Sequence, residues 1–117
     1  MKQSQLIKGV LEGCVLAIIS QGETYGYQLM QALHHHGFPS LVGGTLYPLL
    51  AKLEKGGDIV SVKKPSPDGP ARKYYTLTPQ GKETFQTFQH QWSQLSGHVN
   101  QLIDEVHSND ETPGHPG

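Results

Sequence analysis

One stretch decides the fold of this 117-residue chain: residues 44–57, which read GTLYPLLAKLEKGG. Its four leucines follow the i, i+3, i+4, i+7 spacing of an amphipathic helix, and two glycines end the pattern. Pro48 has no backbone N–H and is tolerated only near the start of a helix, so we expect this helix to begin close to Gly44. With the leucines turned inward, the outward face carries Thr45, Tyr47, Pro48, Lys52 and Lys55.

Two more helices are predicted before this stretch. Apolar residues recur at helical spacing over residues 6–19, and Gln21-Gly22 ends that pattern. Thr24 is a suitable N-cap for a second helix, which stops at His34-His35-His36. Adjacent histidines on a helix point in different directions, which favours exposed polar residues over a metal site.

A β-hairpin is predicted after the third helix. Residues 59–63 and 72–77 are β-prone, and the intervening residues 65–70 are rich in proline and turn formers. Tyr74 and Tyr75 alternate faces, so one of them belongs to the core. Three helices followed by a hairpin is the order of a winged helix-turn-helix domain, whose third helix enters the DNA major groove while the hairpin contacts the backbone or an adjacent groove.

A long helix is predicted to follow, with Thr78 as its N-cap and Pro79 as its first residue. If it runs to about His107, its 29 residues span roughly 43 Å, more than a small domain can cover. Its apolar residues keep a heptad spacing, which predicts a seam that needs a partner helix. The seam consists of Phe85, Phe88, Trp92, Leu95, Val99, Leu102 and Val106.

Two arrangements satisfy this seam. A two-fold homodimer pairs the seams of two chains and places two recognition helices about one DNA turn apart, roughly 34 Å, on a palindromic operator. Alternatively the seam folds back on the first helix of its own chain, and both contacts can coexist. The expected class is therefore mainly α with a small β-hairpin. The expected division is a winged helix-turn-helix domain over residues 1–77, a C-terminal dimerisation helix over 78–107 and a disordered acidic tail over 108–117.

Charge separates the two parts of the chain. Residues 1–82 hold all nine lysines and arginines and five acids, for a net charge of +4, whereas residues 83–117 hold five acids and no base. The basic residues between 52 and 73 are Lys52, Lys55, Lys63, Lys64, Arg72 and Lys73. Each of them could neutralise a phosphate of double-stranded DNA, although a solvated charged face is the plainer interpretation of the cluster.

Other function classes find little support. No apolar run approaches the roughly 18 residues that a membrane span requires, and Met1 opens no long apolar leader, so we expect a cytoplasmic protein with no membrane partner. The single cysteine, Cys14, fits a reducing compartment and is read as a packing residue. No phosphate loop, close carboxylate pair or nucleophile with a base stands out, so neither an enzyme nor a cofactor is expected.

Several of these motifs together resemble the PadR family of bacterial transcriptional regulators. The resemblance rests on residues 44–50, 53–57 and 70–78 with Gly81, and covers roughly residues 6–95. The sequence Tyr25-Gly26-Tyr27 stands where the family has a Tyr-Gly pair in its second helix. Asp58 stands where the family more often has an apolar residue, and Val42-Gly43 replaces a polar helix cap.

The resemblance implies a dimeric repressor that releases its operator when a ligand or a stress signal arrives. It implies that Tyr25, Thr45, Tyr47 and Lys52 face DNA from the helix-turn-helix and that Lys64, Arg72 and Lys73 serve the wing. The expected dimer interface consists of Phe85, Phe88, Trp92, Leu95, Val99 and Leu102.

Trp92 is open to two interpretations. A lone tryptophan in an interface usually packs and nothing more. The resemblance to short family members that end in one long helix implies instead that Trp92 stacks on a flat aromatic effector within the dimer interface. Small residues on an opposing helix, above all Gly13 in the stripe Gly9, Gly13 and Ala17, would leave room for that ligand beside Phe88.

An alternative function belongs to a different class. The chain would then be a helical protein-interaction module without specific DNA binding, in which the long helix recruits another helical protein and the basic hairpin is only solvated surface. The salt dependence of duplex binding separates the two hypotheses, because phosphate contacts weaken steeply as salt is added.

Overall fold

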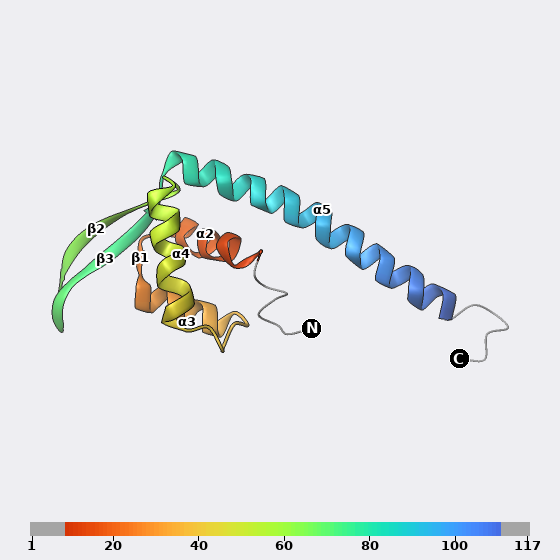
Figure 1. Ribbon diagram of the computed structural model, residues 1–117, viewed down its shortest axis with the longest axis horizontal. Helices are drawn as coiled ribbons and strands as arrows, with labels where there is room; N and C mark the ends of the chain where they lie inside the picture. The colour runs from red at the N-terminus through yellow and green to blue at the C-terminus, as the bar shows by residue number, and fades with distance from the viewer. Residues whose placement is uncertain (1–8, 111–117) are drawn as a thin grey trace. The chain divides into compact units, whose positions relative to one another are not determined.

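The computed structural model describes residues 9–110, which belong to two compact units with a boundary between Gln86 and Thr87. The elements in chain order are α2 (Leu11–Ser20), β1 (Thr24–Tyr25), α3 (Gly26–His35), α4 (Gly43–Lys55), β2 (Ile59–Ser66), β3 (Gly69–Leu77) and α5 (Pro79–Asp110) (Figure 1). The expected start of the first helix at Leu6 lies outside the described residues. Gly9 lies in a turn before α2 and not in the helix, so the predicted small-residue stripe does not include it.

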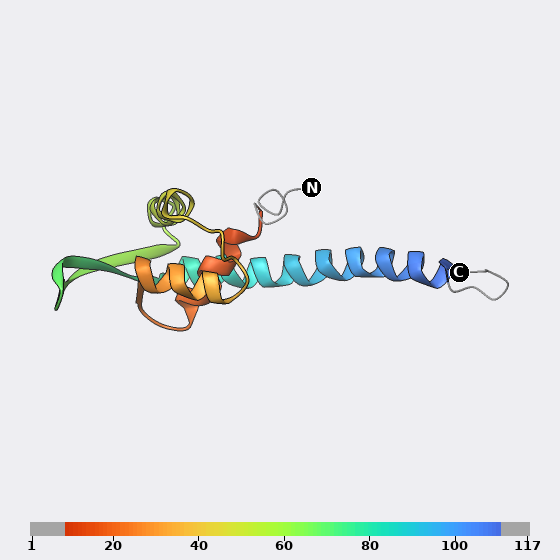
Figure 2. The same cartoon turned by 90° about the horizontal axis from the view of Figure 1, so that it is seen from below.

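The core of the first unit lies where α2, α3 and α4 meet the sheet. Each helix turns one apolar face inward. The two perpendicular views show that α4 crosses α3 at a steep angle (Figures 1 and 2). The predicted inward leucines of α4 are buried, except that Leu49 is half-buried. The buried cluster consists of Leu11, Val15, Leu16, Ile19, Leu29, Leu33, Leu46, Leu50, Leu53, Ile59 and Tyr75. Truncating one such leucine to alanine costs about 2–5 kcal/mol.

The sheet has three strands and not the two of the predicted hairpin. Thr24 is not the N-cap of the second helix, because Thr24 and Tyr25 form the short strand β1 and α3 begins at Gly26. β1 pairs antiparallel with β3, so the strand order is β1-β3-β2. The correction has a physical cause: Thr and Tyr favour extended backbone, and the outer edge of β3 offers hydrogen-bonding groups that β1 satisfies.

The hairpin of β2 and β3 has the predicted alternation of faces. Tyr75 lies opposite Ser61 and is buried, whereas Tyr74 lies opposite Val62 on the other face and is half-buried. One tyrosine of this pair is therefore a core residue, as expected, and the other is available at the surface.

The loop between α4 and β2 receives the start of α5. α4 ends as predicted at Gly56-Gly57, and Gly57 has the positive φ of +90° that favours glycine. The Thr78 hydroxyl caps α5 by accepting the N–H of Gly81 at 2.9 Å, and it donates to the Gly57 carbonyl at 2.6 Å. The first turn of α5 is thus attached directly to the end of α4.

Asp58 has a clear role at this junction. Its carboxylate accepts hydrogen bonds from the Gln80 amide at 3.0 Å and the Thr84 hydroxyl at 2.8 Å. Its backbone carbonyl accepts the N–H of Thr78 at 3.1 Å. A negative charge beside the first turn of a helix is also favourable for the helix dipole. An acid at this position therefore anchors α5, where an apolar residue could not.

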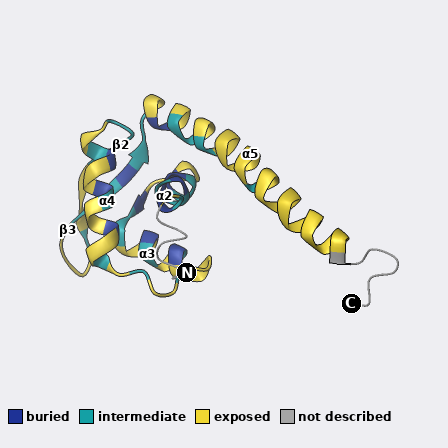
Figure 3. Ribbon diagram, turned by 45° about the vertical axis from the view of Figure 1, so that its right-hand side comes forward, coloured by how far each residue is buried: buried dark blue, intermediate teal, exposed yellow. Residues whose placement is uncertain are grey.

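α5 continues to Asp110, three residues beyond the predicted end at His107. The remainder of the expected tail, residues 111–117, lies outside the described residues. Within the second unit the helix is exposed over most of its length (Figure 3). None of the helices in the described part of the chain is long and apolar enough to cross a membrane.

Candidate nucleic-acid interface

The exposed face of α4 carries the side chains predicted to read DNA. Because Leu46, Leu50 and Leu53 point into the core, the polar side chains between them face outward. Thr45, Tyr47 and Lys52 are all exposed, and the side chain of Lys52 is 72% exposed. This exposed face of α4 can approach a groove of DNA.

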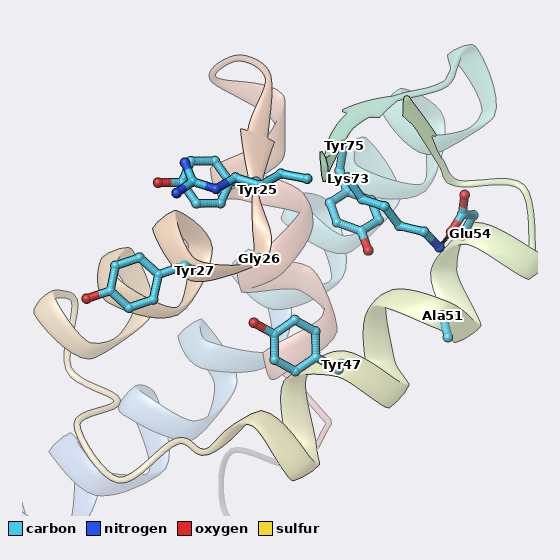
Figure 4. Close-up of a pocket in the computed structure, with 9 residues that line it drawn as sticks. Tyr25, Gly26, Tyr27, Tyr47, Ala51, Glu54, Lys73 and Tyr75 are labelled. Carbon is cyan, nitrogen blue, oxygen red and sulfur yellow. Dashed lines mark ion pairs between the residues drawn. The ribbon is translucent and has the colours of Figure 1, made fainter. Parts of the chain in front are cut away.

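The ring of Tyr47 lies close to two glycines, whose lack of a side chain leaves room for it. A Cβ on Gly26 would meet Cε1 of Tyr47 at 2.6 Å, and a Cβ on Gly43 would meet Cδ2 of the same ring at 3.1 Å. In Figure 4 the Tyr47 hydroxyl points toward the chain at Gly26. The Tyr25-Gly26-Tyr27 motif therefore needs its glycine so that the ring of Tyr47 can pack against α3.

An open cleft of about 530 Å³ lies between α4, the start of α3 and β3. It brings together four residues that were predicted to contact DNA, namely Tyr25, Tyr47, Arg72 and Lys73. Figure 4 labels three of them, Tyr25, Tyr47 and Lys73. The full lining consists of Tyr25, Gly26, Tyr27, Tyr47, Ala51, Glu54, Arg72, Lys73 and Tyr75. The cleft is therefore lined by aromatic rings and cations, and the exposed face of α4 lies next to it.

Wing cations stack on tyrosines of the sheet. The guanidinium of Arg72 lies 4.4 Å from the ring centre of Tyr25, and the ammonium of Lys64 lies 5.3 Å from that of Tyr74. The two rings meet edge to face at 5.3 Å, because β1 places Tyr25 opposite Tyr74 in the sheet. These cation–π contacts orient both charges on one face of the wing.

Each of the four predicted cations also has an acidic partner. Lys52 lies 3.2 Å from Glu12, and Lys64 lies 2.6 Å from Glu23. Arg72 lies 3.7 Å from Asp68, and Lys73 lies 4.0 Å from Glu54. All four pairs are partly exposed to solvent. Exposed pairs of this kind contribute only about 0–1 kcal/mol, so a phosphate can compete for the cation.

Sequence reasoning assigned no DNA contact to five lining residues of this cleft, and two of these, Tyr27 and Glu54, carry polar groups at its surface. Tyr27 is 60% exposed at its rim, and Glu54 accepts a hydrogen bond from Ser61 at 2.5 Å. Burial raises the pKa of the Tyr75 phenol, and the charge of Glu54 adds to this effect, so the phenol stays neutral. Tyr27 belongs to the Tyr25-Gly26-Tyr27 motif, and Glu54 belongs to the run 53–57 that carries the family resemblance, but the sequence assigned Glu54 no role.

The residues predicted for dimerisation and ligand binding divide between the two units. Gly13 is buried within α2, and Phe85 packs against the core of the first unit. Phe88 is half-buried on α5, whereas Trp92 is 47% exposed. The predicted seam residues Leu95, Val99 and Leu102 are exposed as well. In the described part of the chain, no group of histidines, cysteines and acids could hold a metal ion.

Comparison with known proteins finds relatives over most of the chain. The sequence pattern of the "Transcriptional regulator PadR-like family" matches residues 15–87. A solved transcriptional regulator from Streptococcus is 52% identical, with 85% of this chain and 97% of that protein covered and a TM-score of 0.77. A PadR-like transcriptional regulator from Bacillus cereus is 47% identical, with coverages of 86% and 97% and a TM-score of 0.79. Transcriptional regulator Rv3488 from Mycobacterium tuberculosis is 40% identical over 68 residues, which are 58% of this chain and 62% of the relative.

Proposed function

Because this chain belongs to the PadR-like family of transcriptional regulators, which bind DNA and are not enzymes, we propose that it is a dimeric repressor that a small planar ligand or another signal releases from its operator. The observation that carries the proposal is the exposed face of α4, which continues into the cleft lined by wing cations. Family membership favours this function over a protein-interaction module.

α4 enters the major groove, which is about 12 Å wide in B-form DNA and accepts one helix. Thr45 and Tyr47 lie on its exposed face and meet base edges, while Lys52 meets a phosphate. Lys64, Arg72 and Lys73 on the wing neutralise further phosphates of the same site. The phosphate contacts set the register of the protein on the duplex, and the base contacts supply sequence preference.

α5 forms the dimer. The part of α5 in the second unit carries a stripe of exposed large apolar side chains, and an exposed apolar stripe of this length marks an interaction surface. The stripe consists of Trp92, Leu95, Val99, Leu102, Ile103 and Val106, with Leu102 64% exposed. Two-fold pairing of two such helices buries both stripes and gives a palindromic operator with half-sites about 34 Å apart.

The effector binds between the two subunits at Trp92. The exposed indole offers a flat face, so a planar aromatic ligand stacks between Trp92 and its symmetry mate, next to Phe88. A ligand that prefers a dimer with the wrong recognition-helix separation weakens operator binding by the ratio of its affinities for the two states.

DNA binding is tested with operator fragments recovered by sequencing the DNA that co-purifies with the protein. In fluorescence anisotropy titrations over a salt series, Arg72→Ala should reduce the salt slope by up to about 0.9 for each phosphate that the side chain no longer neutralises, and by less where the freed Asp68 takes up a cation. Lys82→Ala is the matched control, because it removes one positive charge from the exposed first turns of α5. Equal slopes for both variants, or no duplex binding by the unchanged protein at low salt, would refute the assignment.

The dimer and the effector site need separate measurements. Sedimentation equilibrium should give a dimer for the unchanged chain and a monomer for Leu102→Asp, since a charge in the seam has no partner there. Trp92→Ala should keep the dimer and lose affinity for planar aromatic dyes. Unchanged dye affinity in Trp92→Ala would mean that Trp92 only packs.

A further inference from the structure

The acidic residues of the DNA-reading unit are not scattered among its cations. Residues 1–82 hold five acids, and Asp58 is the one that anchors α5. The other four each pair with a cation proposed to contact phosphate. Lys55 and Lys63 are exposed as well, yet within residues 9–110 neither lies in an ion pair. The acids therefore form ion pairs with the proposed phosphate contacts and not with the neighbouring Lys55 and Lys63.

Three of these pairs connect different elements of the fold. Glu12 of α2 reaches Lys52 of α4 across 40 positions of sequence, and Glu23 before β1 reaches Lys64 of β2 across 41. Glu54 of α4 reaches Lys73 of β3. Local sequence preference cannot create such pairs, because their members meet only after the domain has folded.

We propose that Glu12, Glu23 and Glu54 are internal competitors of the DNA phosphates and set the affinity of the regulator for any duplex. The proposal rests on the proposed function, because it takes Lys52, Lys64 and Lys73 as phosphate contacts. Each cation exchanges its carboxylate for a phosphate when DNA binds. The carboxylate that is left behind lies close to the DNA backbone and repels it.

The exposure of the pairs makes this exchange feasible. The side chains of Glu12 and Glu23 are each 37% exposed, so water and salt ions reach both members of each pair. A buried pair would hold its cation too tightly for release, whereas an exposed one opposes DNA only weakly. Each ion pair therefore lowers the affinity for DNA by a small amount, and DNA binding stays reversible.

The competition also predicts an unusual salt dependence. A free lysine that binds a phosphate releases one condensed counterion, which contributes about 0.9 to the slope of log affinity against log salt. A lysine that leaves a carboxylate frees an acid, which then attracts a cation from solution. This uptake offsets part of the release, so neutralising the acid should steepen the slope as well as raise the affinity.

Glu12→Gln and Glu23→Gln test the proposal in the full-length chain. An exposed pair is worth about 0.2–1 kcal/mol, so each substitution should tighten binding about threefold per subunit and about tenfold for a dimer. The probe is a fluorescent duplex of unrelated sequence, titrated at several salt concentrations. Because phosphates are common to all sequences, an operator fragment should gain affinity by the same factor.

Glu83→Gln is the matched control. It makes the same change in net charge on the exposed first turns of α5, where no ion pair to a described cation is formed. Its affinity and salt slope should stay close to those of the unchanged protein. Equal gains in Glu83→Gln and Glu12→Gln would overturn the proposal, because net charge alone would then explain them.

A double-mutant cycle gives the decisive readout. If Glu12 acts through Lys52, the gain from Glu12→Gln must disappear in a Lys52→Ala background. A gain that persists there would refute the pairwise mechanism. Failure of the two proposals is distinguishable: no duplex binding by the unchanged protein at low salt refutes the DNA contacts, whereas normal binding that Glu12→Gln and Glu23→Gln leave unaltered refutes only the competition.

Discussion

Replacing Gly81 with alanine has two opposite effects on stability: alanine has a higher helix propensity than glycine, but its side chain has no room at this position. Gly81 is buried in the first turn of α5, and alanine is favoured over glycine in a helix by about 1 kcal/mol. An added Cβ, however, would lie 2.9 Å from the carbonyl carbon of Asp58 and closer still to its carbonyl oxygen. Carbon atoms pack at about 3.5–4.0 Å, so α5 and the α4–β2 loop must separate by roughly an ångström.

That separation should cost more than the helix propensity returns. Overpacking costs about 1–3 kcal/mol, and the hydrogen bond from Thr78 to the Asp58 carbonyl would lose about 1 kcal/mol if it broke. We expect Gly81→Ala to lower the free energy of unfolding by about 2 kcal/mol and Tm by roughly 10 °C. Urea and thermal denaturation, followed by circular dichroism at a helical wavelength, measure both.

Gly97→Ala is the control for the propensity effect. Gly97 lies in the same helix, and nothing within 4 Å would meet its Cβ, so this variant should gain up to about 1 kcal/mol. If Gly81→Ala proved as stable as Gly97→Ala, the close approach of α5 to Asp58 would not exist in the folded protein and the reasoning would fail.

Three further predictions concern single residues. Gly26→Ala should displace the Tyr47 ring, whose Cε1 lies 2.6 Å from the added Cβ, and weaken DNA binding about tenfold, or 1.4 kcal/mol; an unchanged anisotropy titration would show that the ring position is irrelevant. Thr78→Ala removes the α5 cap and should cost about 1–2 kcal/mol in urea denaturation, with Thr78→Ser largely restoring it. Burial raises the pKa of the Cys14 thiol above its ordinary value of 9.0, so a thiol reagent should react more slowly with the folded than with the unfolded chain. The free energy of unfolding should therefore decline as the pH rises above 9.0, because the unfolded chain then loses this proton first. Equal reaction rates of the folded and unfolded chain would contradict the burial of Cys14.

The helices of the first unit were predictable because their signals are local. The leucines of α4 repeat at helical spacing and Gly56-Gly57 ends the helix, so periodicity predicted the element, its inward face and its C-terminus. β1 was not predictable in this way. Thr24 is a good N-cap by local preference, but the edge of β3 lies some fifty positions later in the chain and outweighs that preference in the folded domain.

Some features of the candidate site were likewise predictable from local signals, and others were not. The exposed residues of α4 and the bases of the wing follow from helical and strand periodicity. The ion pairs of Lys52 and Lys64 do not, because their partners are 40 and 41 positions away and only the tertiary fold brings them close. Counting charges over residues 1–82 suggested a freely basic surface, whereas the fold shows four of its cations already in ion pairs.

The junction at Asp58 gives the first turn of α5 a direct mechanical connection to α4. The contact between Gly81 and the Asp58 carbonyl joins backbone to backbone, and the Thr78 hydroxyl bonds to the Gly57 carbonyl in the loop that ends α4. Backbone contacts deform less readily than long side chains, since no rotamer change can absorb the displacement. In the proposed dimer, a ligand that turns the first turn of α5 must therefore move the end of α4 with it. A larger side chain at Gly81 would loosen this connection, so such a variant should bind the effector normally while its DNA affinity responds less to the bound ligand.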